Sequence, residues 1–249
     1  MYSPRPCAGL LLALLLAGSV GAQGGDDATV EADFGVASRR VFRGIERAGS
    51  SAQASVEIAR DEFRAGISAS QPFAADAGGE MTLSAAYRWK TDGQLSFEVS
   101  AAHYWFAAGS PDRTRFSNEG GLTANLPPIQ GFAPSVSYFH DFRLESDTWQ
   151  AAVAHSFPLT SLGAFLDCNV FAGTASGRNW RPDSPGPARH DDYAWWGAEA
   201  HVPYRVGPHA TVIAGLHFTH ASNWSPINGP FGRSAGTNLW VTLGVSLDF

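Results

Sequence analysis

The segment Thr237-Asn-Leu-Trp-Val-Thr-Leu-Gly-Val-Ser-Leu-Asp-Phe249 alternates apolar and mainly polar residues over its whole length. Successive side chains of an extended strand point to opposite faces. One face of this segment therefore carries Leu, Val and Phe, and the other carries Asn, Thr, Gly, Ser and Asp beside one Trp. This pattern predicts a β-strand that separates an apolar environment from a polar one.

The same alternation recurs along the chain, and each repeat is followed by a turn or a loop. The further segments lie at about 29–38, 50–60, 62–70, 80–90, 94–106, 115–126, 132–142, 148–157, 163–174, 192–202 and 209–220. The connections expected at the outer end are 39–49, 71–79, 107–114, 143–147, 175–191 and 221–236. The expected inner connections are 61, 91–93, 127–131, 158–162 and 203–208. With 143–147 as the misfit, long outer connections alternate with short inner ones, as in bacterial barrels.

We therefore expect an all-β fold, a closed antiparallel transmembrane β-barrel of about 12 strands with both termini in the periplasm. A soluble β-sandwich is the alternative. Apolar faces made mostly of Ala, Val, Leu and Phe favour lipid, where an open sheet edge would leave backbone groups without hydrogen bonds. The last strand, which ends on an aromatic residue, is similar to the recognition signal of outer-membrane barrels.

The first 22 residues have the features of a secretory signal peptide. Arg5 precedes an apolar run, and Val20-Gly-Ala22 is a small-residue cleavage site. We expect 1–22 to be removed and 23–249 to form the barrel in the outer membrane of a Gram-negative bacterium. Cys168 is then the only cysteine of the mature chain, so no disulfide is expected.

The composition bears on partners and cofactors. The net charge of the 249 residues is −6, which argues against nucleic acid as a partner because binding it requires a basic face. No nucleotide fingerprint is present, and no cofactor is expected. No metal site is expected either, because the histidines are scattered and His217 and His220 face opposite sides of one strand. The oligomeric state stays open.

The polar faces carry more acidic than basic residues. The inward acids are Glu31, Asp33, Glu57, Glu98, Glu119, Asp141, Asp167, Glu199 and Asp248. The inward basic residues are Arg64 and Arg88. A water-filled lumen of this charge would favour cations. The alternative is an interior plugged by paired polar groups.

Most arginines of the mature chain fall in the expected outer loops. They are Arg39, Arg40, Arg43, Arg47, Arg113, Arg115, Arg143, Arg178, Arg181, Arg189 and Arg233. Arginine binds phosphate bidentately, so phosphorylated outer-leaflet lipid such as lipopolysaccharide is a possible partner. The favoured alternative is local pairing with Asp112, Glu145, Asp147, Asp191 and Asp192.

The segment Ser38-Arg-Arg-Val-Phe-Arg-Gly-Ile45 resembles the beginning of the TorF family of porin-type barrels, in which an Arg-Gly-Ile/Val segment follows the first strand. The resemblance is firm over about 28–70 and loose near 193–204 and 238–240. It implies an outer-membrane barrel of porin type and brings no established ligand residues. Gly44 suits a tight turn, and Arg43 is expected at the mouth of the barrel.

The segment His220-Ala-Ser-Asn223, followed by Asn228, resembles a motif of outer-membrane lipid A deacylases. That resemblance implies Ser222 as nucleophile, His220 as base, and Asn223 or Asn228 as oxyanion donor. The acidic orienter is missing, because 224–247 contains neither Asp nor Glu. The favoured prediction is a porin that admits small hydrophilic solutes with a mild cation preference. The alternatives are this hydrolase and a non-conducting barrel that binds a partner through its loops.

Overall fold

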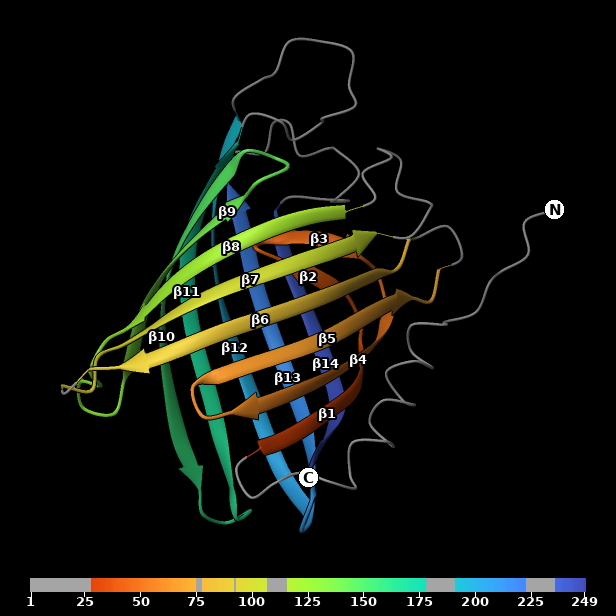
Figure 1. Ribbon diagram of the computed structural model, residues 1–249. Coiled ribbons are helices and arrows are strands. Elements are labelled where there is room, and N and C mark those ends of the chain that lie inside the picture. Colours follow the sequence, from red (N-terminus) through yellow and green to blue (C-terminus); the bar gives the residue numbers. More distant parts are fainter. Residues whose placement is uncertain (1–27, 75–77, 92, 107–115, 178–190, 223–235) are drawn as a thin grey trace.

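The computed structural model describes residues 28–74, 78–91, 93–106, 116–177, 191–222 and 236–249. Twelve antiparallel strands close into a barrel in which each strand pairs with its neighbours in the chain (Figure 1). They are β1 (Ala28–Ala37), β4 (Ser51–Arg60), β5 (Phe63–Pro72), β6 (Glu80–Lys90), β7 (Ser96–Phe106), β8 (Phe116–Asn125), β9 (Ala133–Asp141), β10 (Ser146–Leu159), β11 (Ala164–Gly177), β12 (Asp191–Gly207), β13 (Ala210–Ser222) and β14 (Thr237–Asp248). The predicted strand number is confirmed.

The first and last strands close the sheet. Their register pairs Glu31 with Asp248 and Ala37 with Thr242. At the end of the ladder, the backbone N–H and C=O of Val30 each bond to Phe249, at 3.2 and 2.9 Å. Closure leaves the barrel without an unpaired edge, which is the condition for crossing hydrocarbon. No helix in the described part of the chain is long and apolar enough to span a membrane.

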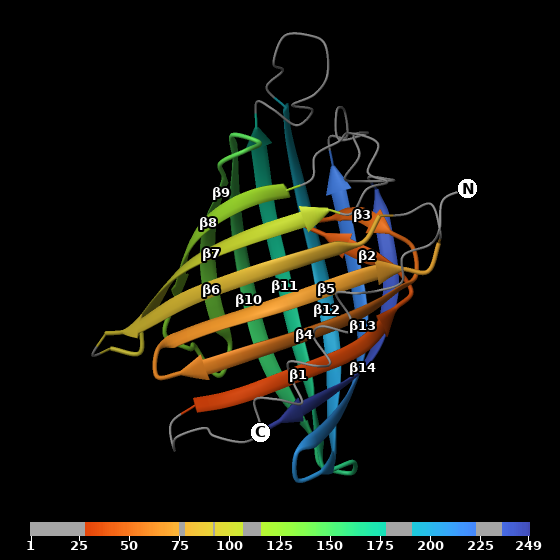
Figure 2. The ribbon, with the colours of Figure 1, turned by 45° about the vertical axis from the view of Figure 1, so that its right-hand side comes forward.

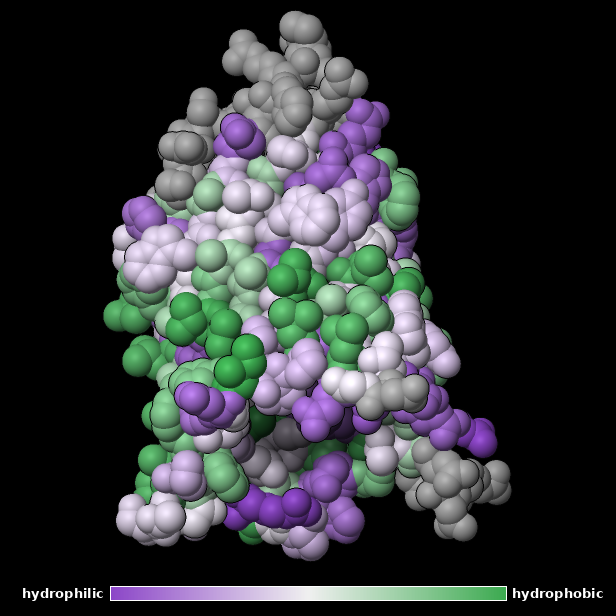
Figure 3. Space-filling model, turned by 90° about the vertical axis from the view of Figure 1, so that its left-hand side faces the viewer, coloured by the Kyte–Doolittle hydropathy of each residue, from purple (hydrophilic) through white to green (hydrophobic). Residues whose placement is uncertain are grey.

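The outer surface of the barrel is apolar. Figure 3 shows hydrophobic residues gathered around the middle of the molecule, with more hydrophilic ones toward its ends. The alternate residues Leu239, Val241 and Leu243 of β14 are between 54% and 59% exposed. Such exposure of large apolar side chains on a closed sheet marks the surface that a bilayer would cover. Trp89, Trp105 and Trp149 lie on this outer face as well.

The structure changes several predicted boundaries. Strand β12 extends to Gly207, so the connection expected at 203–208 is reduced to a turn at 208–209. Strand β10 begins at Ser146, and only 142–145 separate it from β9. The turns after β4, β6, β8, β10 and β12 lie at one end of the barrel. The short turn at 142–145 and the strand ends that flank 107–115, 178–190 and 223–235 lie at the other end.

The connection expected as a loop at 39–49 instead forms a hairpin of two strands, β2 (Arg40–Phe42) and β3 (Ile45–Ala48). Figures 1 and 2 both place this hairpin inside the ring of barrel strands, toward the end with the long connections. The loop prediction was therefore wrong for this segment. Three arginines of the hairpin, Arg40, Arg43 and Arg47, pair with acids of the inner wall. No sequence pattern within 39–49 predicts these pairs.

The two faces of β6 allow a test of the apolar surface. Leu83 is 49% exposed on the outer face, and its neighbour Thr82 borders an internal cavity. In lipid bilayers, Leu83→Arg should lower the free energy of unfolding by about 2–4 kcal/mol, because the charge enters hydrocarbon. Thr82→Arg should cost much less, since its charge stays in the polar interior. Denaturant titration followed by tryptophan fluorescence measures both, and equal losses would contradict the assignment of the faces.

Candidate functional site: the lumen and its internal hairpin

The turn of the internal hairpin consists of Arg43 and Gly44. Both residues have positive φ angles, 50° and 80°, as a two-residue hairpin turn of this kind requires. Gly44 also lies close to the barrel wall: a Cβ atom there would come within 2.6 Å of Trp195 Cβ and 3.3 Å of Ala221 Cβ. Glycine is therefore needed both for the backbone angle and for the close approach to β12 and β13.

An apolar contact fixes one side of the hairpin. Ile45 is 6% exposed and packs in a buried cluster with Ala175, Tyr193, Trp195 and Ala221 of three successive barrel strands. On these strands the side chains that meet Ile45 point into the lumen, opposite to the lipid-facing set. The upper lumen thus contains a small hydrophobic core, whose burial stabilises the inward position of the hairpin.

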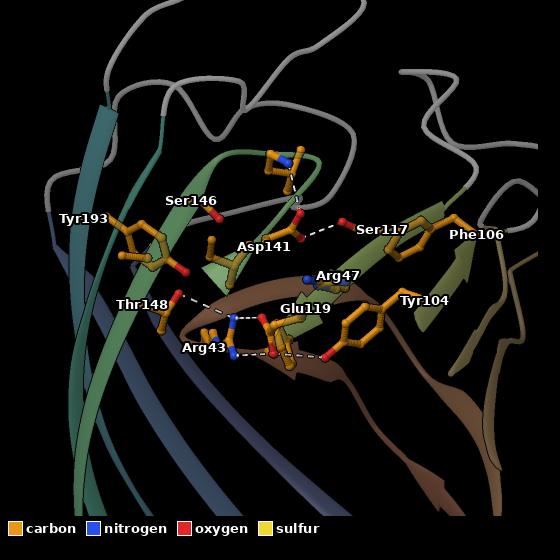
Figure 4. A pocket seen from close by; sticks show the side chains of 14 residues that line it. Arg43, Arg47, Tyr104, Phe106, Ser117, Glu119, Asp141, Ser146, Thr148 and Tyr193 are labelled. Atoms are coloured by element: carbon orange, nitrogen blue, oxygen red, sulfur yellow. Dashed lines mark hydrogen bonds and ion pairs between the residues drawn. The ribbon is translucent and has the colours of Figure 1, made fainter. Parts of the chain in front are cut away.

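A bidentate ion pair fixes the other side. Arg43 donates to both carboxylate oxygens of Glu119 on β8, at 2.6 and 2.9 Å, and its Nη1 lies 3.5 Å from Thr148 Oγ1 of β10. Tyr104 donates to Glu119 at 3.4 Å. Figure 4 shows Arg43 between Thr148 and Glu119, with Tyr104 beyond the carboxylate. Because Arg43 and Glu119 are 14% and 8% exposed, either charge would be poorly compensated without the other.

Two more arginines bind a single carboxylate on β6. Arg40 lies 2.6 Å and Arg47 3.2 Å from the two oxygens of Glu80. On β14, Asn238 donates to the carbonyl of Gly44 at 3.3 Å. The hairpin is therefore bonded to walls on different sides of the barrel, and it spans the lumen.

A cavity of about 560 Å³ borders this hairpin. Arg40 belongs to its lining, together with acids on β1 and β6 and histidines on β12 and β13. In this cavity Glu31 accepts a hydrogen bond of 2.8 Å from Ser246, and Asp33 accepts one of 2.9 Å from Ser55. A second, small pocket of about 60 Å³ lies between Phe42, Tyr104 and Tyr193 around the Arg43 side chain.

The acids and arginines predicted to face inward lie on the inner side of their strands. Near the short-turn end, Arg64 and Arg88 both bind Glu98, at 2.6 and 2.8 Å. The strand alternation places the remaining predicted residues on the same side. They are Glu31, Asp33, Glu57, Glu119, Asp141, Asp167, Glu199 and Asp248.

The predicted charge balance of the lumen needs a correction. From the sequence, Arg40, Arg43 and Arg47 were predicted to lie at the mouth and to pair with acidic loop residues. In the structure, all three pair with acids of the inner wall. Among the loop arginines that the structure describes, Arg39 is the one that pairs locally, with Glu46 at 3.3 Å. The hairpin thus brings positive charge into an interior that the strands alone make strongly acidic. Asp112, Arg113, Arg115 and the arginines at 178–189 and 233 lie outside the described residues.

Some residues of this site were not predicted from the sequence. Glu80 shares the inward face of β6 with Thr82. Its ion-pair partners, Arg40 and Arg47, come from a segment that was predicted to be a loop. His201 and His217 were read as scattered, but they lie together beside Glu199. Glu199 and His217 are register partners, so the strand pairing of the hairpin formed by β12 and β13 could have indicated this proximity.

The hydrolase motif is only partly within the described structure. His220 lies on the outer face, where its Nδ1 is 3.1 Å from Thr237 Oγ1. The side chain of Ser222, and Asn223 and Asn228, lie outside the described residues. The serine–histidine pair therefore stays a prediction.

Several solved structures have a similar fold. The KdgM porin in complex with disordered oligogalacturonate has a TM-score of 0.55 and 9% identity over 89% of this chain and 99% of that one. An outer membrane channel from Pseudomonas putida F1 has a TM-score of 0.57 and 11% identity over 91% and 99% of the two chains. For the NanC porin the values are 0.50 and 10%, over 88% and 98%. The chain has the fold of outer-membrane porins. No protein-family profile and no curated protein matches the sequence.

The approach of Gly44 to Trp195 predicts how the hairpin can be released. Gly44→Ala should displace it, because overpacking costs about 1–3 kcal/mol and shifts the equilibrium toward a detached hairpin. Gly131→Ala is the matched control: Gly131 ends another two-residue turn with φ 84°, and the nearest atom to its Cβ would be the His155 ring edge at 3.0 Å. Hydrogen exchange of the 40–48 amides should accelerate in the first variant alone. Equal exchange in both variants would contradict the docking.

Proposed function

We propose that this protein is an outer-membrane porin through which small hydrophilic solutes diffuse, with the hairpin of β2 and β3 setting the width of the path. The observation that carries the proposal is a polar lumen, bounded by Glu31, Asp33 and Arg40, inside a barrel whose outer face is apolar. A barrel of twelve strands is wider than the eight that side chains just fill, so the hairpin is the element that narrows it.

We further propose a mild preference for cations and an orientation with both termini in the periplasm. On the periplasmic side of the hairpin, Glu31 and Asp33 accept hydrogen bonds from serines. Within the part of the chain that the structure describes, no arginine forms an ion pair with either of them. The arginines of the hairpin are engaged by Glu80 and Glu119. A solute would thus meet net negative charge after the constriction. Lipopolysaccharide is the lipid proposed to surround the outer rim.

Planar-bilayer recording of the purified, folded protein tests the proposal and the role of the hairpin. Ala37 and Ser51 are register partners, so residues 39–49 can be replaced by Asn-Gly, which closes two paired strands tightly. Wild-type protein should give discrete channel openings, and the shortened variant should conduct several-fold more current. Folded wild-type protein without any channel events would exclude a porin. Unchanged conductance in the variant would exclude the hairpin as the constriction.

The cation preference has its own test. The double variant Glu31→Gln/Asp33→Asn removes two carboxylates from the cavity, and Asp61→Asn/Glu62→Gln removes two from the exposed turn between β4 and β5. In a potassium chloride gradient, the reversal potential should move toward zero in the first variant and stay at the wild-type value in the second. The same shift in both would place the selectivity outside the cavity.

A further inference from the structure

Three side chains with metal-binding chemistry meet on the inner wall at β12 and β13. Glu199 and His201 are two residues apart and share the inward face of β12. His217 of β13 is the register partner of Glu199. Their ligand atoms all lie within 4.8 Å of one another. Two imidazoles and a carboxylate are a ligand set typical of transition-metal dications, whereas Mg²⁺ and Ca²⁺ prefer oxygen ligands alone.

Two of these ligand atoms already have the spacing that a metal ion requires. His217 Nδ1 lies 3.4 Å from Glu199 Oε2. Two ligands about 2.1 Å from a tetrahedral Zn²⁺ are about 3.4 Å apart, so an ion fits between them with little movement. His201 stands at 4.9 Å from His217, measured between ring centres, and one of its ring nitrogens lies within 4.8 Å of the ligand atoms of Glu199 and His217.

Neighbouring residues hold the ligands in the orientation that binding requires. The other ring nitrogen of His217, Nε2, lies 2.9 Å from Thr242 Oγ1, and when it donates there, Nδ1 keeps its lone pair for a metal. Asn169 donates to the second oxygen of Glu199 at 3.0 Å. Metal-ligating histidines and carboxylates generally have such outer hydrogen bonds. His217 also stacks on Trp240, with ring centres 4.8 Å apart.

The site has both room and access. Gly215 lies beneath the two imidazoles, and a Cβ atom there would come within 2.7 Å of His201 and 2.8 Å of His217. His201 and His217 line the 560 Å³ cavity that Arg40 of the hairpin also borders. Asp167, the register partner of His201, adds a second negative charge nearby. Water from the cavity would complete the coordination, as in sites with three protein ligands.

We propose that Glu199, His201 and His217 bind a transition-metal dication, represented by Zn²⁺, in the wall of the lumen. The ion would lie on the path of diffusing solutes, on the cavity side of the hairpin. It would add positive charge where the wall is acidic, and it would offer an open coordination position to a carboxylate or hydroxyl group of a solute. Metal binding at this site does not depend on whether the barrel conducts, whereas the effect of the ion on solutes rests on the proposed function.

Isothermal titration of the folded full-length mature barrel in detergent with Zn²⁺ tests the site. We expect one bound ion per chain, and at least about tenfold weaker binding in His201→Gln/His217→Gln, since two of three ligands are lost. The control His103→Gln/His155→Gln removes the same number of imidazoles from the outer face and should bind as the wild type does. Equal affinity in all three proteins, or a wild type that binds no Zn²⁺, would overturn the proposal.

If the double variant does not fold, a single substitution and a second metal still test the site. Glu199→Gln keeps the shape and the hydrogen-bonding capacity of the side chain while removing its charge, and it should also weaken binding. Co²⁺ bound to the wild type should give the visible absorption of an ion with nitrogen ligands, and Zn²⁺ should displace it while Mg²⁺ should not. Displacement by Mg²⁺ would mean that only the carboxylates attract the ion, and it would refute the histidine site.

Discussion

The hydrogen-bonded closure of β1 onto β14 is the constraint on which the rest of the structure depends. In surroundings without water, unpaired backbone groups at a free edge would each cost several kcal/mol, so the sheet is stable there only as a ring. The ring then separates two environments completely. Every strand must present apolar side chains outward, and every inward side chain must find water or a polar partner within a space of limited width.

The hairpin supplies polar partners for inward side chains of the wall. Glu80 and Glu119 are nearly buried carboxylates, and the arginines that compensate them come from the internal hairpin rather than from the barrel wall. The dependence is mutual, because Arg43 would be equally uncompensated in the lumen without Glu119. Ile45 adds an apolar contact that needs no charge. Wall and hairpin therefore stabilise each other, and a narrowed path results from the same contacts that balance the charges.

Local sequence patterns predicted the wall of this site better than its centre. The inward position of Glu31 or Arg64 follows from alternation within one strand, which is local information. The pairing of Arg43 with Glu119 joins residues 76 positions apart in the chain, and no local pattern contains it. The group formed by Glu199, His201 and His217 is intermediate between these two cases. Its members lie on adjacent strands, and their proximity follows once the register is known, but a one-residue shift would send His217 to the lipid face.

The sequence by itself determined the strands, their two faces, their number and the closed antiparallel sheet, because alternation with period two is a property of neighbouring residues. It also indicated a tight turn at Gly44, because glycine readily adopts positive φ angles. Only the tertiary structure decided that residues 40–48 turn inward, that their arginines neutralise wall acids, and which histidines meet. Those outcomes depend on which inward side chains face one another across the lumen, and that is set by the strand register and the curvature of the whole ring.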